Sequence, residues 1–264
     1  MSVDTPLRMH RHDDGVVVLQ LDLPERRNAM TVELTAAWER EVAAVRADRS
    51  VRCVVVTGEG ATFSAGGDLS WIVADPDFTV DQQRDRMLAF YRAWLSIREL
   101  EVPVLAAVNG PAIGAGLCLA LACDLRYGTE ATVFSVPFAA LGLHPGMAAT
   151  WLLPMAVGLP RARELFFTGR TVAAAEAASI GLLNGVLPAD RLLADVLDIA
   201  SGIAAQAPIA IRLTKAALAG GGHPSLEAAL EWEALAQPIT LVTADLREGV
   251  AAARERRRPT FQGR

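Results

Sequence analysis

The chain contains little cysteine and little histidine, and its excess of negative over positive charge is small. Its three cysteines, Cys53, Cys118 and Cys123, lie in apolar runs without the spacing of metal ligands. We therefore expect buried free thiols in a reducing compartment, which favours a cytoplasmic protein, and no metal site among the four scattered histidines. A net charge of −5 argues against general nucleic-acid binding.

Signal-peptide and membrane-span patterns are absent or interrupted. The N-terminus, from Asp4 to Asp14, has no apolar core of the kind found in signal peptides. The run Val102–Cys123 has 22 residues without charge, which is long enough to imitate a membrane span. Pro103, the Asn109-Gly110-Pro111 turn and two later glycines divide it into pieces of strand and helix length. We expect this run to form buried core, and we expect no membrane partner.

Strand-like and helix-like segments alternate over most of the chain. Val16–Leu23, Arg52–Thr57 and Val104–Val108 are apolar runs typical of strands. Thr31 can cap a helix whose apolar residues repeat at helical spacing. A long amphipathic segment from Leu69 to about Leu100 is broken at 75–77. The alternation indicates an α/β fold.

The character of the sequence changes near Pro188. From there onward it reads as almost all helix, over Leu192–Ala205, Ile209–Ala219, Ser225–Gln237 and Thr243–Arg258. We therefore place a candidate boundary there, with a core from 1 to 188 and a C-terminal helical region from 189 to 264.

Two glycine-rich loops carry the strongest functional signal. Phe63–Asp68 follows one predicted strand, Asn109–Gly116 follows another, and each opens a predicted helix. The first amides of a helix have no intrahelical partner, so two such ends facing each other could hold an oxygen that gains negative charge. A dinucleotide site is disfavoured because Leu119 stands where the third glycine of that fingerprint belongs. The chain also lacks the Gly-x-Ser-x-Gly elbow of serine hydrolases.

In order along the chain, a series of motifs resembles the crotonase family, also called the enoyl-CoA hydratase/isomerase family. They are Pro24-Glu-Arg-Arg-Asn-Ala-Met30, Phe63-Ser-Ala-Gly-Gly-Asp68, Pro103 to Gly116, Ala122-Cys-Asp124, Leu141-Gly-Leu-His-Pro-Gly146, Phe167-Thr-Gly-Arg170, Ala178-Ser-Ile-Gly-Leu182 and the ending Glu248 to Phe261. The resemblance implies a spiral of β-β-α units with two roughly perpendicular sheets. It further implies a C-terminal helical region used for trimerisation, giving a homotrimer or a hexamer built from two trimers.

The same resemblance implies an acyl-coenzyme A substrate and no separate cofactor. By position, the resemblance implies that the backbone amides of Gly67 and Ala115 bind the thioester oxygen. These residues lie in the two glycine-rich loops already described. Residues at family positions near coenzyme A are Arg26, Arg27, Ala29, Ala65, Gly66, Asp68, Leu69 and Arg256. Asp68 also has the position of a helix cap, which is the interpretation we favour for its carboxylate.

The acid–base groups depart from the family pattern. Hydratases of this family carry two glutamates, and counting from neighbouring motifs places Cys118 and Phe138 at those positions. Cys118 lies in the first turn of a predicted helix, where the dipole can lower a thiol pKa, but burial in the apolar core is the favoured interpretation. His144 lies in the loop where some members place catalytic groups, and it is either a general base or a loop-stabilising imidazole. Isomerisation or other enolate chemistry can then replace hydration; the alternative is a non-catalytic acyl-CoA-binding homologue.

We expect weak or absent hydration of crotonyl-CoA. A phenyl ring cannot transfer a proton, and an ordinary thiol is a poor acid–base partner at neutral pH. Steady-state hydration kinetics test this: a turnover number in the usual enzyme range of about 1–10³ s⁻¹ would show that another group activates the water.

Overall fold

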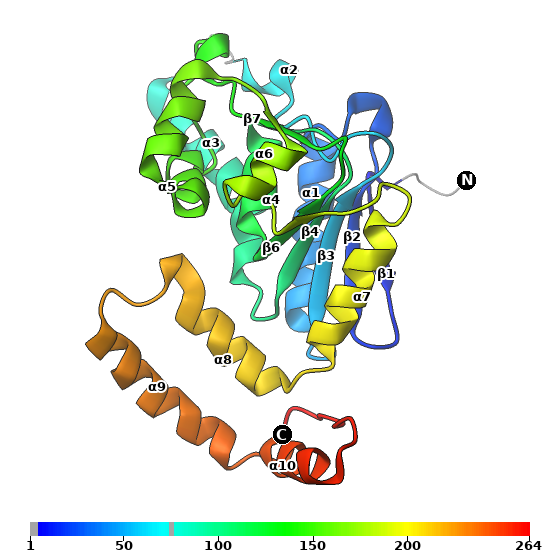
Figure 1. The fold of residues 1–264 in the computed structure, drawn as a ribbon. Coiled ribbons are helices and arrows are strands. Elements are labelled where there is room, and N and C mark those ends of the chain that lie inside the picture. Colours follow the sequence, from blue (N-terminus) through cyan, green and yellow to red (C-terminus); the bar gives the residue numbers. More distant parts are fainter. Residues whose placement is uncertain (1–4, 74–76) are drawn as a thin grey trace.

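The computed structural model describes residues 5–73 and 77–264, and its ribbon shows a mixed α/β body with helices on both faces of a sheet (Figure 1). The larger sheet has the strand order β1-β2-β3-β4-β6-β9, and a smaller sheet has the order β5-β7-β8. In the larger sheet β1 is antiparallel to β2, whereas the pairs from β2 to β9 are parallel. The two sheets and the alternation of elements confirm the fold class expected from the sequence.

The segments expected from the sequence form strands and helices with similar bounds, and further elements lie between them. The strands are β1 (Leu7–Arg11), β2 (Val16–Leu21), β3 (Cys53–Gly58), β4 (Val104–Val108), β5 (Ala112–Ile113), β6 (Leu125–Gly128), β7 (Val133–Ser135), β8 (Val172–Ala173) and β9 (Gly185–Val186). The α-helices are α1 (Val32–Ala47), α2 (Leu69–Ile72), α3 (Val80–Leu95), α4 (Ala115–Ala122), α5 (Ala149–Thr168), α6 (Ala174–Ser179), α7 (Leu192–Ala204), α8 (Pro208–Leu218), α9 (Leu226–Leu241) and α10 (Ala244–Glu255). Short 3₁₀ turns are η1 (Pro24–Arg26), η2 (Ser96–Glu99), η3 (Ala139–Leu141) and η4 (Ala219–Gly221). Thr31 caps α1 as predicted, because its hydroxyl accepts from the Leu34 amide at 3.2 Å. The expected break at 75–77 falls largely on residues 74–76, which lie outside the described residues.

Alternate residues along β3 belong to two separate apolar clusters, one on each face of the sheet. In β3, Val54 and Val56 belong to the larger cluster, whereas Cys53 and Val55 belong to a smaller one beneath α7. This division is the period-two pattern of a strand buried on both faces. Helix α7 covers the second face (Figure 1). The segment after 188 thus begins with a helix that packs onto the sheet, and the division at 188/189 stays a prediction.

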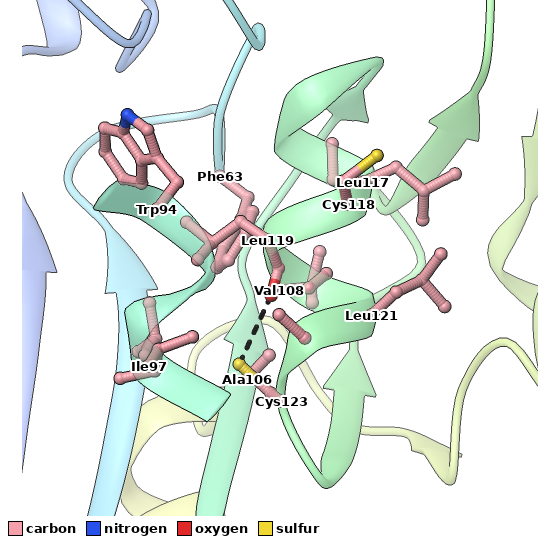
Figure 2. Close-up of a cluster of buried hydrophobic side chains, with 14 of the residues drawn as sticks. Phe63, Trp94, Ile97, Ala106, Val108, Leu117, Cys118, Leu119, Leu121 and Cys123 are labelled. Atoms are coloured by element: carbon pink, nitrogen blue, oxygen red, sulfur yellow. Dashed lines mark hydrogen bonds between the residues drawn. The ribbon is translucent and has the colours of Figure 1, made fainter. Parts of the chain in front are cut away.

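The uncharged run from 102 to 123 is core, as expected. It folds into β4, β5 and α4, and the residues of α4 are buried. Figure 2 shows Leu119 directed toward Phe63 and Trp94, while Cys123 donates its thiol proton to the Leu119 carbonyl at 3.4 Å. Within the ranges that the structure describes, no single helix is long and apolar enough to cross a membrane, although α7 with the bent segment Pro208–Gly221 meets the length and composition test as a pair.

The last three helices extend away from this body (Figure 1). Within the part of the chain that the structure describes, α9 has no buried side chain, although the helix carries several leucines. Helix α8 is tied to the body by Lys215, whose ammonium lies 2.8 Å from Asp124 Oδ2 and donates to the Val102 carbonyl at 2.7 Å. The same carboxylate oxygen accepts from the Val104 amide at the start of β4. One cation therefore joins the C-terminal helices to the edge of the core.

We predict that Lys215→Met lowers the free energy of unfolding by about 1–3 kcal/mol, because it leaves a carboxylate and a carbonyl without their charged donor. Arg84→Met is the control: Arg84 pairs with the adjacent Asp85 on the surface, and such exposed pairs are worth about 0–1 kcal/mol. Denaturant unfolding of both variants measures the difference. Equal stabilities would contradict an anchoring role for Lys215.

Candidate functional site

The two glycine loops pack against each other through their backbones. A β-carbon at Gly116 would lie 2.3 Å from the Ser64 carbonyl oxygen, and one at Gly66 would lie 2.5 Å from the Ile113 carbonyl oxygen. The Ile113 amide donates to the Ser64 carbonyl at 3.0 Å, so a hydrogen bond crosses the same contact. Gly66 also has φ +89°, a conformation that side chains with a β-carbon rarely adopt. Only residues without a side chain allow this approach.

A third segment fixes the first loop from the other side. Asn28 is fully buried, and its side-chain amide donates to the carbonyls of Glu59 and Thr62 while its oxygen accepts from the Leu23 amide. The Ser64 hydroxyl in turn donates to the Asn28 carbonyl at 2.8 Å and accepts from the Gly66 amide at 3.1 Å. Each of these polar groups is paired, so the loop that precedes Gly67 is held rigidly. Asn28 belongs to a motif noted in the sequence, but no role was assigned to it there.

A cavity of about 380 Å³ lies between these loops, α3 and the segment before α5. Gly67 and Ala115 both line it. A β-carbon at Gly66 would lie only 3.1 Å from the Ala115 amide nitrogen, which shows how closely the two loop ends approach. Ala115 is the first residue of α4, and among the described residues neither its amide nor that of Gly67 donates to a backbone carbonyl. Two free donors therefore border one largely apolar space.

Cys118 does not behave as an activated thiol. It is completely buried, and burial raises its pKa to about 12. Its sulfur lies 3.8 Å from the carbonyl oxygen of Gly146. Gly146 lines the cavity, whereas Cys118 is not among the described lining residues. Desolvation thus outweighs the helix dipole, and the core interpretation is confirmed. Phe138 does line the cavity, with its ring 3.8 Å from the position of a β-carbon on Gly114.

His144 lies on the cavity wall and is exposed. Its Nδ1 is 2.8 Å from the carbonyl oxygen of Pro145. Because a carbonyl can only accept, we assign the proton of the neutral ring to Nδ1, which leaves Nε2 as the free basic nitrogen. The ring is thus held by the loop and still presents a proton acceptor.

The residues expected near coenzyme A fall into two groups. Arg26 pairs with Asp68 at 2.7 Å, and the Ala65 amide donates to the Arg27 carbonyl at 2.9 Å, so these positions adjoin the first glycine loop. Ala65 and Leu69 line the cavity, and the amide of Met30, the residue after Ala29, donates to the Gly66 carbonyl at 2.8 Å. Arg256 instead follows α10, at the far end of the ribbon from α2 and α3 (Figure 1).

Asp68 is a helix cap. Its Oδ1 accepts from the Ser70 hydroxyl at 2.7 Å and from the Ser70 amide at 3.0 Å, while Oδ2 accepts from Arg26. The Ser70 hydroxyl above all, together with the Ser70 amide and Arg26, holds the pKa of Asp68 below its ordinary value. Its lone pairs are engaged, so capping rather than proton transfer is its role.

Sequence reasoning missed two polar side chains that line the cavity, Gln83 and Tyr91 on α3. They are eight residues apart, which places them on one face of the helix. No motif marks them, and helical periodicity alone could not tell which face of α3 meets the cavity.

Comparisons with known proteins identify the family. The family model described as enoyl-CoA hydratase/isomerase matches residues 11–264. The chain is 34% identical over 251 residues to the 2,3-dehydroadipyl-CoA hydratase of Escherichia coli, covering 94% of this chain and 96% of that protein. It is 33% identical over 250 residues to the crotonyl-CoA hydratase of Syntrophomonas wolfei, covering 94% and 95%.

Among solved structures, an enoyl-CoA hydratase from Bacillus anthracis superimposes with a TM-score of 0.92 at 31% identity, covering 98% of this chain and all of that one. The loops, the cavity and these matches along the whole sequence lead to one conclusion: the chain belongs to the enoyl-CoA hydratase/isomerase family.

Proposed function

We propose that this protein binds an acyl-CoA thioester and moves a proton between carbons of its acyl group, converting a 3-enoyl-CoA to a 2-enoyl-CoA. The observation that carries the proposal is the pair of free amides, from Gly67 and Ala115, on one apolar cavity. A thioester oxygen between them would be stabilised as it gains charge in an enolate. Removal of one such donor typically costs about 10²–10³ in rate.

The lining of the cavity favours isomerisation over hydration. Among its described lining residues there is no carboxylate, and Cys118 and Phe138 occupy the positions where the family resemblance expects glutamates. Hydration needs a group that holds and deprotonates water, whereas isomerisation needs only a base, an acid and an enolate site. His144 Nε2 is the base in this proposal, because Nδ1 is engaged with Pro145.

A second candidate is a binding protein without turnover. The absence of carboxylates from the described lining supports it, since the amide pair would remain able to bind a thioester without any chemistry. Turnover of any enoyl-CoA separates this candidate from the isomerase.

The C-terminal helices support an assembly of several copies, and we propose a homotrimer or a hexamer. Leu226, Leu235 and Val242 are 77%, 71% and 75% exposed. Apolar side chains gathered on projecting helices typically mark an interface. Sedimentation of the purified protein measures the state, and a monomer at micromolar concentration would contradict the assembly.

We predict that the protein binds acyl-CoA thioesters with micromolar to sub-millimolar affinity and binds octanoyl-CoA more tightly than acetyl-CoA. The wall is mostly apolar, and each buried methylene contributes about 0.8 kcal/mol. Calorimetry with acetyl-, crotonyl- and octanoyl-CoA, and with free coenzyme A, gives the dissociation constants. Neither heat nor thermal stabilisation with any thioester would contradict the proposed function, because a ligand of the folded state must stabilise it.

We predict that His144→Ala lowers isomerase turnover by roughly 10²–10⁴ and leaves acyl-CoA affinity nearly unchanged. An exposed side chain contributes little to stability, so the melting temperature should also hold. His10→Ala, which removes an exposed imidazole on β1, controls for loss of a histidine in general. A lower melting temperature with unchanged turnover would assign His144 a structural role instead.

A further inference from the structure

Among the described residues that line the cavity there is one tyrosine, and the position of its hydroxyl is closely defined. Tyr91 lines the wall from α3 and is half-buried. A β-carbon on Gly146 would lie 2.4 Å from the Tyr91 hydroxyl oxygen, so this oxygen stands directly against the Gly146 α-carbon. The carbonyl oxygen of the same Gly146 lies 3.8 Å from the buried sulfur of Cys118. The hydroxyl therefore shares its neighbour Gly146 with Cys118, which stands at a position where the family resemblance implies a glutamate.

Aromatic contacts hold this part of α3 in place. Phe90, the neighbour of Tyr91, packs on Trp71 with ring centroids 4.9 Å apart. One turn later Trp94 stacks on Trp38 of α1, also at 4.9 Å, and donates its ring N–H to Thr35 at 3.0 Å. A side chain between two such contacts is held in a fixed direction, which an acid–base group requires.

The phenol is a donor rather than a base at neutral pH. Burial is the main reason that the pKa of Tyr91 lies above its usual value, with a smaller contribution from Cys118, while the Met147 backbone amide opposes the shift. The same amide would stabilise the phenolate that remains after a proton has left. Tyr91 thus keeps its proton until a stronger base, such as an enolate carbon, takes it.

We propose that Tyr91 is the catalytic proton donor of this site. The proposal rests on the proposed isomerase function and names its missing acid. His144 Nε2 takes a proton from the carbon next to the thioester carbonyl, and the electron pair of that C–H bond forms the enolate. Electrons then move along the chain, and the γ-carbon takes the proton of the Tyr91 O–H bond. The double bond now lies between the α- and β-carbons; the phenolate regains a proton from water and the imidazolium releases one to water.

The test separates the two proton transfers. The substrate is a 3-enoyl-CoA in D₂O. Exchange of its α-hydrogen for deuterium, followed by NMR, reports proton removal by His144. Formation of the conjugated 2-enoyl-CoA reports proton donation by Tyr91. We expect Tyr91→Phe to bind the thioester within about twofold of the unmodified protein and to keep α-exchange within about tenfold. Isomerisation should fall by roughly 10²–10⁴. Tyr127→Phe is the matched control, since Tyr127 on β6 packs against the cluster beneath α7, and it should isomerise at the normal rate.

A second variant tests the position of the hydroxyl. Gly146→Ala keeps the phenol but places a methyl group 2.4 Å from its oxygen, so the ring must move. We expect Gly146→Ala to lower the isomerisation rate at least tenfold when Tyr91 is present. In the Tyr91→Phe background the further loss of rate should be much smaller, because both changes act on the same group.

The outcomes distinguish the proposals. If the unmodified protein neither exchanges nor isomerises any 3-enoyl-CoA, the proposed function fails and the donor role with it. If it isomerises and Tyr91→Phe does so within threefold, or loses exchange and isomerisation equally, only the donor role is overturned. A Gly146→Ala effect that is equally large in both backgrounds likewise overturns it.

Discussion

The site depends on the direct contact between the backbones of two loops. Gly66 and Gly116 each meet a carbonyl oxygen of the opposite loop at a distance that excludes a β-carbon. This contact brings the end of the first loop close to the first amide of α4. The amides of Gly67 and Ala115 then face a cavity rather than a protein carbonyl. Buried Asn28 and Ser64 then fix the arrangement through paired hydrogen bonds. The two amides are therefore in place before a ligand arrives, which the proposed stabilisation of a developing charge requires.

The two groups proposed to transfer protons are a phenol and an imidazole, in place of the carboxylates that the family resemblance leads one to expect. The phenol is held by packed aromatic rings and the imidazole by its own loop, and apart from Gln83 the other described side chains of the wall are apolar. The buried thiol of Cys118 remains protonated, since burial raises its pKa to about 12. The enoyl-CoA hydratase from Bacillus anthracis shares the fold of this chain, so the difference proposed here lies in the side chains that a common fold carries.

Local features were predictable from the sequence, and long-range ones were not. The strand Val104–Val108 and the caps at Thr31 and Asp68 follow from patterns within a few residues. The position of Tyr91 at the cavity depends on how α3 is rotated by contacts with α1 and α2, which no local pattern records. The position of Arg256, far from the cavity in one chain, depends on the path of the last three helices. The site roles of Gly67, Ala115 and His144 stay predictions.

The most direct test of the central claim is a crystal structure with a bound saturated acyl-CoA, such as octanoyl-CoA. The account predicts a thioester oxygen within about 2.7–3.1 Å of the amide nitrogens of both Gly67 and Ala115, which is the distance range of effective oxyanion donors. It also predicts that the acyl chain lies along the wall formed by Tyr91 and Phe138. A thioester bound with its carbonyl directed away from either amide, or an acyl chain outside this cavity, would contradict the account.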